Sequence, residues 1–185
     1  MATAQPFLRI PAGVTGVLAG LLALATSTGA EASDLELAVK ATYLYKLAPF
    51  VTWPASSSGA PEDPLVMCIQ GEDPFGRIID RAVADQRVGS HPIVVRRVAK
   101  LDRVSGCRIA YVAGSRAQSV AQALAAVDGA PMLTVTDAEH GATRGIVHLF
   151  LASGRVRFAI NTARADGNGV SISSKLLALA AEVTR

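Results

Sequence analysis

The segment RIAYVAGSRAQSVAQALAAVDGAPMLTV (residues 108–135) decides the fold class. Its apolar run at 108–113 predicts a buried strand, and the small residues that follow predict a turn. The spacing of apolar residues over 117–127 predicts a helix, and a second apolar run at 131–135 predicts another strand. A strand, a helix and a strand in this order are typical of two parallel strands joined by a crossover helix.

The same alternation continues on both sides of this segment. Further strands are expected at 65–69, 92–98, 145–151 and 155–160, and further helices at 34–48, 78–83 and 173–183. The strands at 145–151 and 155–160 are separated by Ala-Ser-Gly, which predicts a hairpin. We therefore predict a single α/β domain. Its mixed sheet is mostly parallel, has an antiparallel edge and carries helices on both faces.

The expected helix at 34–48 is amphipathic. Its apolar positions follow helical spacing and predict one buried face, made of Leu37, Val39, Ala41, Leu44, Leu47 and Ala48. Asp34 is suited to cap its start, and Pro49 is expected to end it.

The first thirty residues have the pattern of a secretory signal peptide. Arg9 is the only charged residue before Glu31, and the apolar run at 14–25 is shorter than the roughly 20 residues that a membrane-spanning helix needs. Small residues allow cleavage after Ala30 or after Ala32. An uncleaved membrane anchor is the alternative. We expect a signal peptide over 1–30, or 1–32, and a periplasmic domain over 31–185.

The charge of the chain argues against nucleic-acid binding. The formal net charge is +3, and removal of residues 1–30 takes away only Arg9, which leaves +2. The remaining basic residues are scattered along the sequence, whereas nucleic-acid-binding proteins gather them in patches. A mature chain of this length is long enough to bury one core.

The sequence has two cysteines, Cys68 in the first expected strand and Cys107 at the start of the third. In an oxidising compartment a small, even number of cysteines is usually paired, and neighbouring strands lie about 5 Å apart, within disulfide reach. Two separate buried thiols are the alternative. Because no CxxC motif is present, thiol-exchange catalysis is not expected.

Catalytic and metal-binding motifs are absent from the sequence. The three histidines, His91, His140 and His148, have no metal-ligand spacing, and His148 lies in an apolar run that favours a place in the core or at its edge. There is no GxSxG elbow, P-loop or GxGxxG motif. We expect no enzyme, no cofactor and no metal site, since no nucleophile, base and orienting group can be assembled.

Several blocks of the sequence together resemble the YfiR-like proteins, a family of small periplasmic α/β domains. The blocks keep their order over nearly the whole mature chain: AVKATYLYKLAPFVTWP (38–54), CIQGEDPFG (68–76), CRIAYVAGS (107–115), MLTVTD (132–137), and VRFAIN with GVSISSKLLALA (156–180). The first and last blocks are the most specific.

The resemblance implies a function that residue spacing alone does not give. It implies a periplasmic binding protein that represses an inner-membrane signalling partner, a diguanylate cyclase with a periplasmic sensory domain, and thereby controls cyclic-di-GMP and biofilm growth. It also places Cys68 and Cys107 where a family disulfide is expected, with no cysteines left for a second one. The alternative is a periplasmic small-ligand sensor that acts with a sensor kinase or a transporter. A homodimer is left open.

Five residues are candidates for contact with a partner or ligand. Asn161 ends an expected strand, and Lys175 follows two serines at an expected helix start, where backbone N–H groups hold anions. Tyr43, Tyr45 and Trp53 are aromatic residues in and just after the first expected helix, and aromatic side chains are frequent interface anchors. For Lys175 a solvated side chain beside capping serines is the alternative, and for the aromatic residues it is packing on the sheet.

Overall fold

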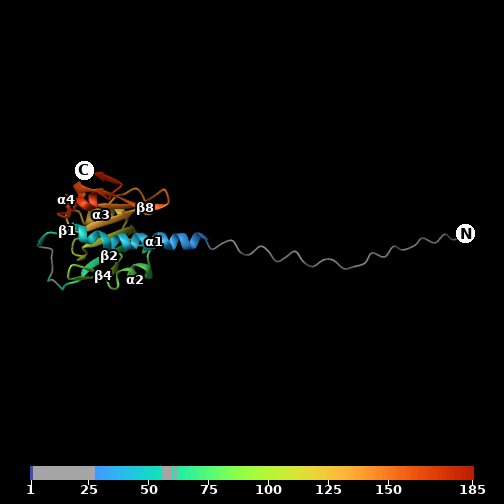
Figure 1. The fold of residues 1–185 in the computed structure, drawn as a ribbon, viewed down its shortest axis with the longest axis horizontal. Coiled ribbons are helices and arrows are strands. Elements are labelled where there is room, and N and C mark those ends of the chain that lie inside the picture. The colour runs from blue at the N-terminus through green and yellow to red at the C-terminus, as the bar shows by residue number, and fades with distance from the viewer. Residues whose placement is uncertain (2–27, 56–59, 61) are drawn as a thin grey trace.

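The structure, a computed structural model, describes Met1 and residues 28–55, 60 and 62–185, the side chains of 28–32 excepted. It is an α/β domain in which helices cover both faces of a mixed sheet (Figure 1). The helices are α1 (Thr28–Leu47), η1 (Ala48–Phe50), α2 (Arg77–Val83), α3 (Val120–Ala126), η3 (Ala138–His140), α4 (Thr162–Gly167) and α5 (Ser174–Leu177). The strands are β1 (Val51–Thr52), β2 (Leu65–Gly71), β3 (Arg87–Val88), β4 (His91–Val98), β5 (Ile109–Gly114), β6 (Leu133–Asp137), β7 (Val147–Ala152), β8 (Arg155–Asn161), β9 (Ser171–Ile172) and β10 (Glu182–Thr184).

The main sheet has eight strands in the order β10-β8-β7-β6-β5-β2-β4-β3. Strands β4, β2, β5, β6 and β7 run parallel, as the strand–helix–strand pattern predicted. β8 is antiparallel to β7 and β3 is antiparallel to β4, so the sheet is mixed. A separate two-stranded sheet joins β1 and β9. The predicted fold class is confirmed.

The core has two layers, one on each face of the sheet. Alternate residues of β2 divide between them: Met67 and Ile69 pack with α1 and α2, whereas Val66 and Cys68 pack with α3. This alternation is the pleat of a strand buried on both sides, and it explains the unbroken apolar run at 65–69.

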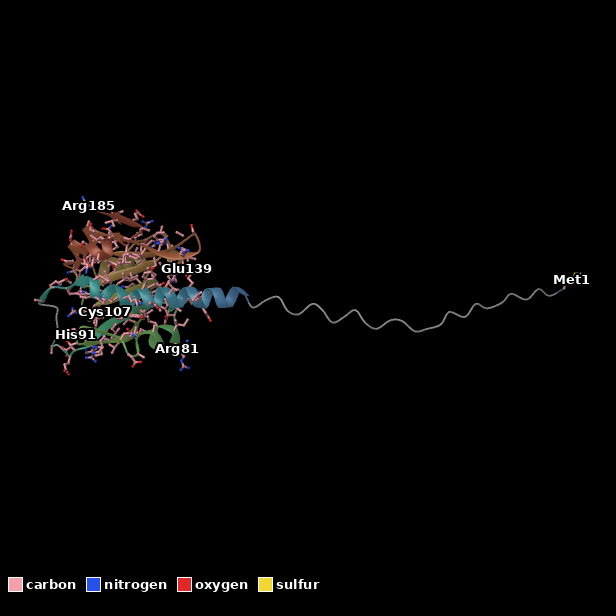
Figure 2. All side chains as sticks on the ribbon, in the orientation of Figure 1. Met1, Arg81, His91, Cys107, Glu139 and Arg185 are labelled. Atoms are coloured by element: carbon pink, nitrogen blue, oxygen red, sulfur yellow. A yellow bond between two sulfur atoms is a disulfide. The ribbon has the colours of Figure 1, made fainter. Side chains whose placement is uncertain are left out.

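The predicted disulfide is present in the α3 layer. Cys68 of β2 is bonded to Cys107, which lies just before the neighbouring strand β5, and their Cα atoms are 5.7 Å apart. Both side chains are buried. Figure 2 labels both Cys107 and Glu139; one precedes β5 and the other follows the parallel strand β6, so they lie at opposite ends of these strands.

The N-terminal prediction lies mostly outside the described residues. The expected signal peptide covers 1–30, whereas helix α1 begins at Thr28 and so spans both expected cleavage positions. Within the described part of the chain, no helix is both long and apolar enough to cross a membrane.

The prediction of a closing helix over 173–183 is wrong. Ser173 caps the helix as expected, but α5 makes only one turn, and the chain then forms β10 alongside β8. The backbone N–H of Ala181 donates to the carbonyl of Phe158, where the two segments meet. Without β10 the outer edge of β8 would present unpaired backbone groups, and satisfying them outweighs the helix propensity of this alanine-rich segment. The antiparallel hairpin therefore lies one strand inside the edge.

The buried face of α1 also differs from the prediction. Ala41, Leu44, Leu47 and Ala48 are buried as expected, but Val39 is 37% exposed. The adjacent Lys40 takes the buried position and is only 1% exposed. The buried face therefore runs through 40, 44 and 47, and Val39 lies on the opposite side of the helix.

Candidate functional site

The carboxyl ends of β2 and β5 are where this topology would place a ligand. The chain passes from β2 to β4 on one side and then returns to β5 on the other, and such switch points form the usual crevice of open α/β sheets. Here the two backbones touch. The N–H of Glu72 donates to the carbonyl of Gly114 at 3.0 Å, and a Cβ on Gly71 would lie 2.1 Å from the same oxygen. Backbone contact therefore occupies the crevice between these strand ends.

A buried ionic cluster lies next to this point, between α1 and the end of β6. Lys40 Nζ lies 2.6 Å from Glu36 Oε1, 2.8 Å from Asp137 Oδ2 and 3.2 Å from Glu139 Oε2. Asp137 is 1% exposed, like Lys40, whereas the Glu139 side chain is 53% exposed. We call these four residues the Lys40 cluster. It joins the middle of α1 to the carboxyl end of a central strand.

The charges of the Lys40 cluster stabilise the ammonium group. Burial by itself lowers the pKa of Lys40, but the hydrogen bonds to Asp137 and Glu36, with the charge of Glu139, raise it above its ordinary value. The lysine is therefore a fixed cation. The three carboxylates and the ammonium group form a structural ionic cluster. They keep the lysine protonated, so it is unsuited to act as a nucleophile or base.

Tyr111 and His140 close the same end of the sheet. The pKa of Tyr111 is raised by burial and by the negative charges of Asp137 and Glu139, so its hydroxyl keeps its proton. The ring of His140 stands edge-on to Tyr111, with centroids 6.0 Å apart. His140 Nε2 is buried and has no hydrogen-bond partner among the described residues.

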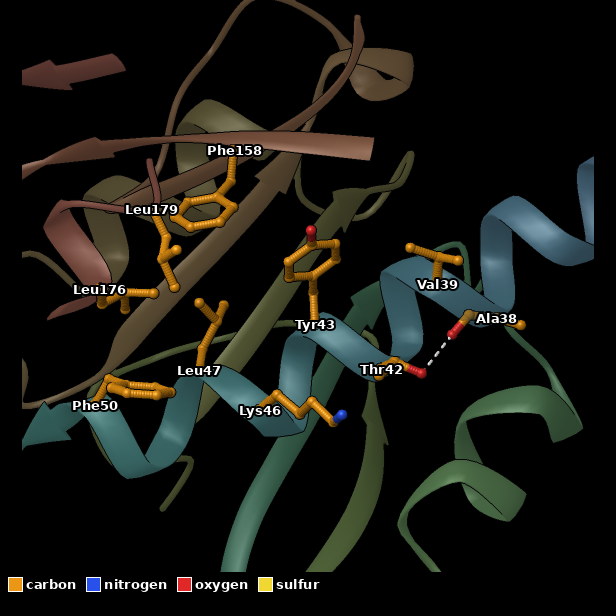
Figure 3. Close-up of a pocket in the computed structure, with 10 residues that line it drawn as sticks. All are labelled: Ala38, Val39, Thr42, Tyr43, Lys46, Leu47, Phe50, Phe158, Leu176 and Leu179. Carbon is orange, nitrogen blue, oxygen red and sulfur yellow. Dashed lines mark hydrogen bonds between the residues drawn. The ribbon is translucent and has the colours of Figure 1, made fainter. Parts of the chain in front are cut away.

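The opposite side of α1 borders a groove of about 500 Å³. Figure 3 shows Tyr43 and Leu47 of α1 facing Phe158 of β8 and Leu176 and Leu179 of the α5 segment. The rings of Tyr43 and Phe158 meet edge to face, 5.7 Å between centroids. We call this the α1 groove; its lining residues are Ala38, Val39, Thr42, Tyr43, Lys46, Leu47, Phe50, Phe158, Leu176 and Leu179.

A second hollow of about 600 Å³ adjoins the first. Val39 and Tyr43 line both hollows, so the two are neighbours along α1. The second is walled by the β7–β8 hairpin, and we call it the hairpin groove; its lining residues are Leu35, Glu36, Val39, Tyr43, Leu151, Gly154, Arg155, Val156 and Arg157. A largely apolar, concave surface of this kind can receive a ligand or a segment of another protein.

The aromatic candidates from the sequence do not gather at one place. Tyr43 lies between the two grooves, as described above. Tyr45 and Trp53 are half-buried and pack against the core cluster on the α1 face. Trp53 Nε1 is buried and makes no hydrogen bond to the described residues. Of the three, Tyr43 is the one that lines the two grooves.

Neither Asn161 nor Lys175 is among the residues that line the two grooves. The Asn161 side chain accepts a hydrogen bond from the N–H of Arg164 at 2.9 Å and caps α4. Because β8 runs antiparallel to β7, Asn161 lies at the opposite end of the sheet from Asp137, and it also lines a hollow beside α3. Lys175 is exposed on the single turn of α5, which Ser173 caps. The Asn161 side chain therefore has a structural role as the N-cap of α4.

His148 is a core residue, as predicted. It is 4% exposed, and its Nδ1 lies 2.9 Å from the Thr136 hydroxyl. Burial, together with the positive charge of Arg144, lowers its pKa. Within the described ranges, no group of three or more His, Cys, Asp or Glu side chains is placed to hold a metal ion.

Comparison with known proteins identifies the family. The model of the YfiR/HmsC-like family matches residues 37–181. The chain belongs to this family. The YfiR/HmsC-like match begins in α1 and ends just before β10, so it includes both cysteines, Lys40, Asp137 and every lining residue of the α1 groove. No curated protein matches the sequence significantly.

Neither the Lys40 cluster nor most of the two grooves was predicted from the sequence. Glu36 and Lys40 are four residues apart, a spacing that indicates an ion pair on a helix, and Lys40 is in helical phase with Leu44 and Leu47. That phase was the signal for a buried lysine. Leu179 carried no comparable signal, because its exposure follows from the early end of α5.

Proposed function

We propose that this protein is an exported regulator that represses an inner-membrane diguanylate cyclase by direct contact in the periplasm. The observation that carries the proposal is membership of the YfiR/HmsC-like family over nearly the whole domain, residues 37–181. The Cys68–Cys107 disulfide supports it, since structural disulfides persist in oxidising compartments. The signal-peptide pattern over 1–30 agrees with that location.

The chemistry of the strand ends favours binding over catalysis. Near the usual ligand crevice, Lys40 and Tyr111 are buried, and their raised pKa values keep both groups protonated. General acid–base catalysis requires a group that exchanges its proton near the working pH. Two largely apolar grooves border α1, and these are suited to contact with another molecule.

Gene deletion tests the proposed function. Deletion is expected to raise cyclic-di-GMP and surface attachment, and the full-length gene is expected to restore both. A version that lacks residues 1–30 remains in the cytoplasm and is expected to fail. Removal of each membrane cyclase in the deletion background then identifies the one that is repressed, because its loss returns cyclic-di-GMP to the starting level. Unchanged cyclic-di-GMP after deletion, under several growth conditions, would contradict the cyclase assignment.

A small-ligand sensor is the second candidate, and the α1 groove is the observation that favours it. A groove of about 500 Å³ with apolar walls and one lysine has the size of a metabolite site. Thermal unfolding with a metabolite panel separates the two functions. A ligand at a hundred times its Kd stabilises the folded protein by about 2.7 kcal/mol. A flat response across the panel would leave the direct repressor as the better assignment.

A further inference from the structure

We propose that the α1 groove and the hairpin groove together bind an amphipathic helix of the membrane partner, with apolar residues on one face and Asp or Glu beside them. We call the two grooves together the α1 surface. The proposal rests on the proposed function, because it names the surface through which this protein contacts its partner.

Exposed apolar side chains gather on the α1 surface. Leu35 is 67% exposed, Leu151 50% and Leu179 64%, and all three line one of the two grooves together with Val39. In the described part of the chain, the other exposed large apolar residues are Met1, Val94, Val104 and Val183, and none of them lines either groove. Single exposed apolar residues need no explanation, whereas a continuous patch marks an interaction site.

The shape of the α1 surface fits a helix. Leu35, Val39, Tyr43 and Lys46 follow one another along α1 at intervals of four, four and three residues, so they form one stripe on the helix. The stripe is about 16 Å long at 1.5 Å per residue, which matches three turns of a second helix. Walls on the far side come from the β7–β8 hairpin and from Leu176 and Leu179. Such a trough receives the apolar face of a helix.

The charges around the α1 surface specify acidic residues on the partner. Lys46, Arg155 and Arg157 line the grooves, are exposed, and take part in none of the ion pairs among the described residues. Glu36 is the one acid in the lining, and it is held 2.6 Å from Lys40. The surface therefore presents unpaired positive charge around an apolar trough, and Asp or Glu beside the apolar face of the partner helix would complement it.

Two other occupants are disfavoured, one by these charges and the other by the shape of the surface. A second copy of this chain, docked through the same face, would bring Lys46, Arg155 and Arg157 near their own counterparts, and like charges oppose association. An anionic membrane would attract the basic residues, but the apolar residues line a trough between elements, whereas a lipid surface is bound by apolar residues that project from the protein. The observations favour a protein helix.

Binding to the full-length membrane cyclase tests the proposal. The cyclase identified by the deletion experiments is reconstituted in nanodiscs, and its affinity for the mature exported protein is measured. Val39→Glu with Leu179→Glu places two negative charges in the α1 groove and is expected to weaken binding at least thirtyfold. Val94→Glu with Val104→Glu is the matched control, because these exposed valines lie off the α1 surface, and it is expected to bind like the wild type.

Charge reversal provides a second, smaller test. Arg155→Glu with Arg157→Glu is expected to weaken binding about threefold to tenfold at low salt, and the loss should shrink as salt screens the charges. Arg81→Glu with Arg116→Glu is the control, since both arginines are exposed and line neither groove. All variants must keep the far-UV spectrum and melting temperature of the wild type, and Leu35→Glu replaces any variant of the α1 groove that does not.

The outcomes separate this inference from the proposed function. If the wild type binds the cyclase and the Val39→Glu/Leu179→Glu variant binds equally well, the α1 surface is the wrong surface and the repressor function stands. If the wild type does not bind the cyclase, the proposed function fails and the inference fails with it.

Two further measurements test the other occupants. Flotation with vesicles that contain phosphatidylglycerol, lost in the Val39→Glu/Leu179→Glu variant, would assign the surface to the membrane. A wild-type dimer in sedimentation velocity that the same variant converts to a monomer would assign it to self-association. Either result would overturn the proposal.

Discussion

The two sides of helix α1 differ in their surroundings: one is buried in an ionic contact, and the other has exposed apolar residues. On one side Lys40 is buried with Asp137 and lies within 3.2 Å of three carboxylates, so that side holds the helix on the end of β6. On the other side, Leu35 and Val39 are exposed and border two grooves. The same helix therefore has one side in contact with the rest of the domain and another side whose apolar residues are left exposed.

This difference indicates which residues serve the fold and which serve recognition. Loss of one partner from a buried ion pair leaves an uncompensated charge, whereas substitution of an exposed apolar residue leaves the folded state almost unchanged. Changes on the Lys40 side should therefore act on stability, and changes on the groove side should act on binding. The predictions below test this separation, from the largest expected effect on stability to the smallest.

Lys40→Met should cause the largest loss of stability. It removes the cation that Asp137 faces in the core, and breaking a buried ion pair costs about 3–5 kcal/mol. Lys46→Met is the matched control on the same helix, because Lys46 is exposed, and it should stay within about 0.5 kcal/mol of the wild type. The free energy of unfolding in urea gives both values. Adding Asp137→Asn to Lys40→Met should recover part of the loss, and no recovery would show that packing dominates at this position.

Replacing Cys68 and Cys107 by Ser should cost about 2–4 kcal/mol, because the bond no longer limits the unfolded chain. The disulfide lies in the α3 layer, away from the α1 surface. The folded fraction of this variant should therefore bind the cyclase with wild-type affinity. A weaker affinity of the folded protein would show that the two layers are coupled.

The Lys40 cluster should also make the free energy of unfolding depend on pH in the alkaline range. The pKa of Lys40 is raised in the folded state above its usual 10.5, so the folded protein holds this proton more tightly than the unfolded chain. That stabilisation is complete below pH 10.5 and is lost as the pH rises through the folded pKa. Unfolding experiments across this range should show a decline in the wild type that is smaller in Lys40→Met. Parallel curves for the two proteins would contradict the cluster described here.

Val39→Glu with Leu179→Glu should have the smallest effect on stability. Val39 and Leu179 are 37% and 64% exposed, and substitutions at exposed positions usually change the free energy of unfolding by no more than about 0.5 kcal/mol. The same urea titration measures it. A loss comparable to that of Lys40→Met would show that the α1 surface contributes to the fold itself.

The sequence predicted the features that depend on local pattern. The apolar runs at 65–69 and 108–113 are strands because both of their faces are buried, and such runs can be read without tertiary information. The disulfide could also be anticipated, because Cys68 lies on one strand and Cys107 just before its parallel neighbour. The fold class follows from these elements.

The features that depend on tertiary contact could not be read in this way. The segment after Ser173 has helical spacing, yet residues 182–184 form a strand because they pair with the otherwise open edge of β8. The helical phase of Lys40 indicated a place on the buried face, but its partner Asp137 is nearly a hundred residues away and could not be identified from the sequence. The grooves were missed for the same reason: their walls come from α1, the hairpin and α5, which lie far apart in the sequence.

Cyclic-di-GMP in the complemented deletion strain tests the central claim most directly. The strain carries the wild type, the Val39→Glu/Leu179→Glu variant or the Val94→Glu/Val104→Glu control, each exported to equal levels. We predict that the wild type and the control lower cyclic-di-GMP to the starting level, and that the groove variant leaves it as high as in the deletion strain. A groove variant that represses as well as the control would contradict the account.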